Sequence, residues 1–165
     1  DKIILSGMGS FDSGMQFLKE AELINILHKK VIVQKTPILG ICLGMQMLTE
    51  RSEEGKLPGL GFIKGATVRF SFKGKTLKIP HMGWNILDLK KESVLFKDMY
   101  KDMRFYFAHS YHVCLYNASD TLTTTYYGYN FVSSFQKDNI AGVQFHPEKS
   151  HKFGMKLFEN FLERF

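Results

Sequence analysis

The fold of this 165-residue chain is decided by one short stretch, PILGICLG, at residues 37–44. Its first half is a continuous apolar run, which is typical of a strand buried in a parallel sheet. Its second half brackets Cys42 between Gly40 and Gly44, and a short helical segment follows at residues 45–51. A strand, a tight glycine turn and a helix in this order form a nucleophile elbow, here with cysteine in place of serine. The stretch therefore predicts an α/β sheet with a reactive thiol at the end of a strand.

The residues before this stretch extend the same pattern toward the N-terminus. Residues 2–5 are apolar and predict a short strand, and the glycine-rich residues 6–10 predict the turn that ends it. Asp12 or Ser13 is the expected N-cap of a helix that runs toward residues 31–33, which alternatively form a strand. The order strand, helix, strand, turn and helix is typical of an open α/β sheet.

The middle of the chain has antiparallel character. Residues 62–72 and 76–87 are β-rich and predict hairpins, and residues 104–113 and 121–145 predict further strands. The residues expected to break or turn these strands are Gly65, Gly74, Gly83, Gly128 and Asp138-Asn139. Ser150 is expected to cap a last helix whose inward residues are Phe153, Leu157, Phe158, Phe161 and Leu162. We therefore expect one α/β domain over residues 1–165, with an open mixed sheet flanked by helices.

Composition excludes several classes of protein. No run of eighteen uncharged apolar residues is present, so we expect no membrane span, and no secretory leader is recognisable. The net charge of +6 is scattered, with no basic block longer than a pair, which argues against nucleic-acid binding. Two cysteines are too few for a disulfide framework and favour the reducing cytoplasm.

A thiol nucleophile needs an imidazole partner, and His146 is the best placed of the six histidines. It follows the apolar strand at residues 140–145, and Glu148 stands two residues later, on the same face of an extended chain. Since a carboxylate can orient the ring and stabilise the imidazolium, we expect a Cys42–His146–Glu148 triad. The elbow should also place the Cys42 sulfur at a helix N-terminus, which favours thiolate.

Other residues allow two interpretations each. The backbone N–H of Leu43 is a natural oxyanion donor, and a second donor could come from residues 6–9, unless that loop is a simple turn or binds phosphate. Cys114 lies in a strand-like segment and is expected in the core. Trp84 stands among turn residues and predicts a lid or an interface anchor, with plain packing as the alternative.

Taken together, GICLGMQ (residues 40–46) and QFHPE (residues 144–148) resemble the two motifs of the class I, triad-type glutamine amidotransferases. Within them, PHMGWN (residues 80–85), YFAHSY (residues 106–111) and EKS (residues 148–150) are most similar to the glutaminase subunits of imidazole glycerol phosphate synthases. The resemblance implies a flavodoxin-like fold, no cofactor and no metal. It also implies a β-α unit of about thirty residues before Asp1, so that the chain would be truncated at its N-terminus.

The resemblance assigns roles that the residues alone do not. It implies that glutamine is hydrolysed to glutamate and ammonia, and that ammonia passes to a (β/α)₈ barrel synthase (cyclase) subunit in a heterodimer. That subunit would make imidazole glycerol phosphate and an aminoimidazole-carboxamide ribotide in histidine biosynthesis. The implied oxyanion residues are Met8, Gly9 and Leu43; the substrate-binding residues are Gly7, Gln46, Ser110 and Tyr111; the partner interface includes Trp84, Asn85 and Lys149.

Three other functions remain open at this level. Paralogues of these subunits supply ammonia to sugar-modifying enzymes of surface-polysaccharide synthesis, and the segments around Cys114 and after Ser150 fit either role. An inactive scaffold would have no physical need for the elbow thiol. A cysteine peptidase on a similar sheet would ignore glutamine analogues. One departure from the family is Ser6, which stands where these subunits usually carry proline.

Overall fold

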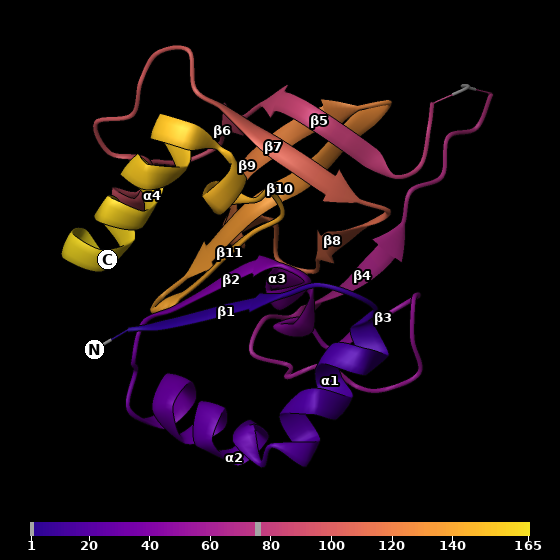
Figure 1. Ribbon diagram of the computed structural model, residues 1–165, viewed down its shortest axis with the longest axis vertical. Helices are drawn as coiled ribbons and strands as arrows, with labels where there is room; N and C mark the ends of the chain where they lie inside the picture. The colour runs from indigo at the N-terminus through magenta and orange to yellow at the C-terminus, as the bar shows by residue number, and fades with distance from the viewer. Residues whose placement is uncertain (1, 75–76) are drawn as a thin grey trace.

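The computed structural model describes residues 2–74 and 77–165 (Figure 1). One part of its main sheet is parallel: β2 (Ile38–Cys42) lies between β1 (Ile3–Gly7) and β11 (Ile140–Val143). These three strands are parallel, so their carboxyl ends meet at one edge. The predicted α/β class with a mixed sheet is confirmed.

The rest of the main sheet is largely antiparallel. From β11 the order continues through β10 (Tyr129–Lys137), β8 (Tyr111–Leu115), β4 (Gly65–Arg69) and β3 (Arg51–Ser52). A branch from β10 adds β9 (Thr121–Tyr127) and β6 (Asp88–Leu89). A separate ribbon pairs β5 (His81–Ile86) with β7 (Arg104–His109). The ribbon packs near β9, beside the antiparallel part of the main sheet (Figure 1).

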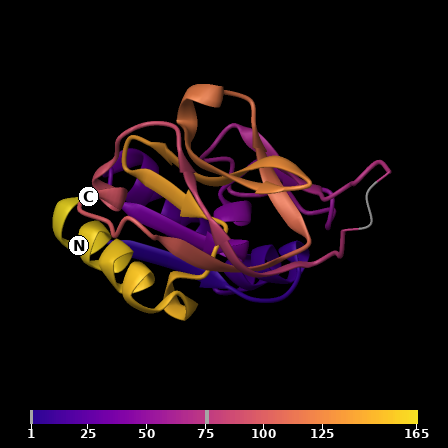
Figure 2. The same cartoon turned by 90° about the horizontal axis from the view of Figure 1, so that it is seen from above.

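Helices cover both faces of the parallel strands. On one side lie α1 (Phe11–Glu20), α2 (Leu23–Leu27) and the π-helical turn η1 (His28–Val33), together with α3 (Leu43–Met47). On the other side lies α4 (His151–Arg164) with the 3₁₀ turn η2 (Val94–Phe96). Two further 3₁₀ turns are η3 (Ala118–Asp120) and η4 (Pro147–Lys149). Both termini lie at the same end of the molecule, beside α4 (Figures 1 and 2).

Several local expectations are wrong. Ser10, not Asp12 or Ser13, caps α1, because Asp12 instead accepts hydrogen bonds from the backbone N–H groups of Lys56 and Leu57. For residues 31–33 the expected helix is confirmed and the strand alternative is wrong, since they end the π-helical turn η1.

The predicted hairpins of the middle region are also wrong. β4 and β5 do not pair with each other, and Gly65 and Gly83 lie inside strands; Thr76, where the second strand was expected to begin, lies outside the described residues. The turns at Gly128 and at residues 138–139 are confirmed.

Two expectations about burial are wrong as well. Cys114 is exposed, because Val113 takes the inward position on β8. Leu162 is exposed, since α4 turns the row Phe153, Leu157 and Phe161 inward. Among the described residues, no helix is long and apolar enough to cross a membrane.

Candidate active site

The predicted elbow is present at the junction of β2 and α3. Cys42 has φ 52° and ψ −108°, a conformation that costs free energy for a residue with a side chain and is held by its surroundings. Both flanking glycines are required by close approach. A Cβ on Gly44 would lie 1.7 Å from the carbonyl oxygen of Leu5, and one on Gly40 would lie 2.8 Å from the carbonyl oxygen of Gly44. Only small residues therefore allow β2 to turn into α3 at this point.

His146 is held beside the elbow by backbone contacts. β11 is the parallel neighbour of β2, with Val143 opposite Ile41, so the segment after β11 leaves the sheet at the same edge as Cys42. The backbone N–H of His146 donates to the carbonyl oxygen of Tyr106 at 2.8 Å, and the Ser150 hydroxyl donates to the carbonyl oxygen of His146 at 2.6 Å. Ser150 thus fixes this turn rather than capping α4 through its side chain.

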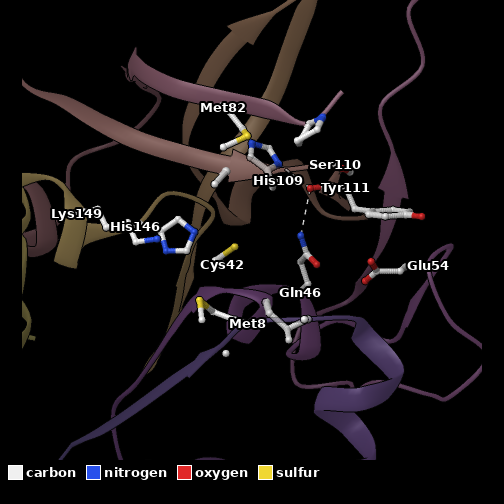
Figure 3. Close-up of a pocket in the computed structure, with 15 residues that line it drawn as sticks. Met8, Cys42, Gln46, Glu54, Met82, His109, Ser110, Tyr111, His146 and Lys149 are labelled. Carbon is white, nitrogen blue, oxygen red and sulfur yellow. Dashed lines mark hydrogen bonds between the residues drawn. The ribbon is translucent and has the colours of Figure 1, made fainter. Parts of the chain in front are cut away.

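The imidazole of His146 is oriented by Glu148. Its Nδ1 lies 2.7 Å from Oε1 of Glu148, as the spacing of the two residues predicts. The His146 side chain is buried and that of Glu148 is about half exposed. Since Nδ1 faces the carboxylate, Nε2 is the ring nitrogen that is free to exchange a proton with a neighbouring group. Figure 3 shows the ring beside Cys42.

Cys42 and His146 share a pocket of about 370 Å³, within the range of small-molecule sites. It opens between the β1–α1 loop and the turn that joins β7 to β8 (Figure 3). The predicted site residues that line it are Gly7, Met8, Gly9, Cys42, Leu43, Gln46, Ser110, Tyr111, His146 and Lys149. Glu148 lies behind the imidazole and lines a neighbouring cavity, and Trp84 and Asn85 lie outside the pocket.

The expectation of a resting thiolate is wrong. The pKa of the Cys42 thiol is raised to about 11, chiefly by burial and to a smaller extent by the Glu148 carboxylate. The Leu43 backbone N–H and the Gln144 amide favour the charged sulfur, but they do not offset the loss of water. Cys42 is therefore a neutral thiol in the free protein and needs a base to become a nucleophile.

Gln46, which lines the pocket, and the buried Gln144 form a line of hydrogen bonds that ends at Cys42. Nε2 of Gln46 donates to the carbonyl oxygen of Tyr111 at 3.2 Å (Figure 3). It also donates to Oε1 of Gln144, at 3.2 Å. Nε2 of Gln144 in turn donates to Sγ of Cys42 at 3.7 Å. No role for Gln144 was predicted from the sequence. The available signal is its position two residues before His146 in an extended segment, which places both side chains on one side.

Glu54 is the second residue that the sequence analysis missed. It lines the pocket opposite His146 and Cys42, and its Oε2 accepts a hydrogen bond from the backbone N–H of Phe11 at 2.8 Å (Figure 3). The pocket thus has a thiol at one side and a carboxylate at the other. That arrangement fits a ligand that carries a reactive carbonyl and, some bonds away, a positive charge. Among residues 2–74 and 77–165, no cluster of His, Cys, Asp or Glu is arranged to hold a metal ion.

Of the residues expected at a partner interface, Trp84 and Asn85 lie on β5, and Lys149 ends the turn η4. Trp84 is in the middle of this strand rather than in a turn, is 43% exposed, and stacks on His151 with ring centroids 5.5 Å apart. Met82 and Ile86 are also exposed and alternate with the inward residues of β5. The strand therefore presents an apolar row to solvent, which is the character of an interaction surface.

Comparison with known proteins gives consistent results. The family model for class-I glutamine amidotransferases matches residues 1–165. The chain is 57% identical over 163 residues to imidazole glycerol phosphate synthase subunit HisH 2 of Methanococcus maripaludis, and 46% identical over 163 residues to the HisH 2 subunit of Pseudomonas aeruginosa. Each alignment covers 99% of this chain and 80% of the relative.

Solved structures support the fold. PurLQS from Thermotoga maritima superposes with a TM-score of 0.67 at 20% identity, over 98% of this chain and 81% of that one. A glutamine amidotransferase from Thermotoga maritima gives a TM-score of 0.63 at 19% identity, over 98% of this chain and 61% of that one.

Proposed function

Because the chain belongs to the class-I glutamine amidotransferase family, we propose that it is the glutaminase subunit of an imidazole glycerol phosphate synthase in histidine biosynthesis. The observation that carries this proposal is that Cys42 and His146 share one pocket, with Glu148 bonded to the His146 ring from behind, in a chain 57% identical to such a subunit. The reaction is the hydrolysis of glutamine to glutamate and ammonia. The competing sugar-modifying role has no observation in its favour.

Hydrolysis begins with transfer of the Cys42 proton to Nε2 of His146. The sulfur attacks the side-chain amide carbon of glutamine, and the carbonyl oxygen takes the negative charge. The backbone N–H of Leu43 lies next to the sulfur and stabilises negative charge there; with the Met8–Gly9 loop it forms the oxyanion hole. His146 then returns its proton to the amide nitrogen, the C–N bond breaks, and ammonia leaves a glutamyl thioester on Cys42.

The second half of the reaction uses the same groups in reverse. His146 removes a proton from water, which attacks the thioester carbon, and the departing sulfur regains its proton. Glu148 keeps Nδ1–H of His146 occupied in both halves, so that Nε2 always faces the reacting atoms.

The rest of the pocket orients glutamine. The Glu54 carboxylate pairs with the α-ammonium group, at the opposite side of the pocket from the thiol. Gln46 and the main chain of Gly7, Ser110 and Tyr111 hold the remaining polar atoms of the amino-acid end.

Ammonia passes to a (β/α)₈ barrel synthase subunit in a heterodimer. The exposed row on β5 with Trp84, together with Asn85 and Lys149, forms the docking surface. Free ammonia would be lost to water, so glutamine hydrolysis is slow until the partner binds. The cytoplasm is the compartment that suits this enzyme, since Cys42 reacts only when reduced. Residues 1–165 act as a single glutaminase domain in this proposal.

The decisive experiment uses a Cys42→Ala variant in the complex with the barrel subunit. The variant should lose glutamine-driven synthesis of imidazole glycerol phosphate and keep synthesis driven by added ammonia. Glutamine-driven turnover that persisted in the variant would refute the role of the thiol. Rescue of a histidine auxotroph by the full gene separates this function from the polysaccharide role, in which no rescue is expected.

A further inference from the structure

Two buried histidines connect the docking strand to the glutamine pocket. His81 on β5 stands opposite His109 on β7, and Nδ1 of His81 lies 3.0 Å from Nε2 of His109. The two residues are 3% and 5% exposed, respectively. His109 lines the pocket (Figure 3), whereas His81 lies one layer further from it, and neither belongs to the triad.

The groups at the two ends of this histidine pair determine which nitrogen of each ring carries the proton. At the outer end, Asn85 accepts a bond from the backbone N–H of Ile86 and donates to the carbonyl oxygen of Tyr126, so its amide orientation is set. Its Nδ2 therefore donates to Nε2 of His81, at 3.3 Å. At the inner end, Nδ1 of His109 lies 2.7 Å from the carbonyl oxygen of Tyr111, which can only accept.

Only one arrangement satisfies both ends. His81 accepts at Nε2 and donates from Nδ1, and His109 accepts at Nε2 and donates from Nδ1. A second proton on either ring would place two N–H groups against each other, so both rings must be neutral. Burial agrees with this, because it lowers the pKa of His81 to about 4 and that of His109 to about 3.

The line of hydrogen bonds continues from the Tyr111 carbonyl oxygen to the Cys42 sulfur. The carbonyl oxygen of Tyr111 accepts from His109 and also from Nε2 of Gln46. Gln46 donates to Gln144, and Gln144 donates to Sγ of Cys42. Asn85, which we placed on the docking surface, is thus joined to the thiol through side chains and a single backbone carbonyl.

We propose that His81 and His109 are positioning residues for glutamine hydrolysis, which hold the Tyr111 carbonyl and through it the Gln46 amide in the geometry that binds glutamine. This inference rests on the glutaminase function proposed above. Without the His109 donor, the Tyr111 carbonyl oxygen keeps only its hydrogen bond from Gln46. The carbonyl is then less firmly held, and the Gln46 amide can move together with it. The effect is on the binding of glutamine and therefore on KM, while the triad keeps its own contacts.

The test compares variants that keep or remove the Nδ1 donor, in the complex with the barrel subunit. Asparagine places its Nδ2 near the position of Nδ1, so His109→Asn and His81→Asn retain the donor, whereas His109→Leu and His81→Leu remove it. The control is His112→Leu. His112 is equally buried and packs on Phe70 as His109 does, but it bonds the Tyr129 hydroxyl and lies off the line.

We expect the leucine variants to raise the KM for glutamine about tenfold with a smaller change in kcat, and the asparagine variants to stay within about threefold of wild type. Equal KM values for the leucine and asparagine variants of the same histidine, when both fold, would overturn the proposal. An equal rise of the KM for glutamine in His112→Leu would overturn it as well. If the leucine variants do not fold, an asparagine variant with a KM raised tenfold would overturn it.

Failure of the proposed function looks different from failure of the positioning role. A wild-type complex that makes product from ammonia but never from glutamine would refute the proposed glutaminase function. A wild-type complex that uses glutamine, together with leucine variants whose KM for glutamine is unchanged, would refute only the positioning role.

Discussion

The resting state of the Cys42 thiol gives the sharpest test of the site. Its pKa is raised from the ordinary value of 9.0 to about 11, chiefly by burial. At pH 7 the thiolate fraction is then about one in 10⁴, about a hundredfold below that of an exposed cysteine. Iodoacetamide reacts with the thiolate, so the rate of Cys42 alkylation should rise about tenfold for each pH unit between 7 and 10. The rate constant is measured by mass spectrometry of the labelled peptide, in a Cys114→Ser background that leaves one thiol.

The slope of the alkylation rate against pH does not depend on how well iodoacetamide reaches the sulfur, because limited access lowers the rate by the same factor at every pH. A plateau below pH 9 would mean a Cys42 pKa below the ordinary value of 9.0 and would refute the reasoning. The matched variant is Glu148→Gln, which removes a negative charge that raises the pKa of Cys42 and should therefore accelerate alkylation at pH 8.

The raised pKa of Cys42 also makes the stability of the fold depend on pH, with a defined sign. The unfolded chain ionises its thiol first, so the stability that comes from the neutral thiol is present below pH 9 and is lost as pH rises toward 11.

Three other changes have defined outcomes. Gly44→Ala sets a Cβ 1.7 Å from a main-chain oxygen of β1, so glutamate release should fall at least about a hundredfold and the thermal midpoint should drop, as calorimetry would show. Glu148→Gln leaves the His146 imidazolium without its counter-charge and should lower kcat about a hundredfold in the complex; an unchanged kcat would contradict the triad. Asn160→Ala removes a buried amide that donates to two carbonyl oxygens of the loop before β7, and urea unfolding should show a loss of about 2 kcal/mol, against no change for the exposed Asn130→Ala.

The sequence predicted what depends on neighbours along the chain. The elbow needs only a strand, two small residues and a helix within ten positions, and all of them are visible between residues 37 and 47. The bond from His146 to Glu148 follows from a spacing of two in extended chain. The partnership of Cys42 with His146 was predicted from residue chemistry, since a thiol needs an imidazole and His146 follows an apolar strand. The contact that joins them is the parallel pairing of β2 with β11, which no spacing along the chain shows.

The errors arise where a distant contact overrides a local preference. Asp12 is a good N-cap by type, but the backbone N–H groups of residues 56 and 57 bind its carboxylate, and the pKa of Asp12 is lowered as a result. The resting thiolate at Cys42 was predicted from the helix N-terminus alone. The apolar packing that buries the sulfur is not visible in the motif, and it has the larger effect. Glu54 was missed for a similar reason, since nothing local distinguishes it from the neighbouring Glu53.

The histidine pair shows why such a link cannot be read from the chain. His81 and His109 are 28 positions apart, and each alone has the pattern of a core histidine in a β-strand. Their contact depends on the register of β5 against β7, which sets His81 opposite His109 and Met82 opposite Ala108. A shift of one residue would turn His81 to the exposed face of the ribbon and Trp84 to the inner face, and the line from Asn85 to Tyr111 would not exist. The register that buries the histidines is therefore the same one that turns the apolar row of β5 outward. One strand pairing thus builds the docking surface and the support of the glutamine pocket together, and a change that loosens the β5–β7 ribbon should weaken both.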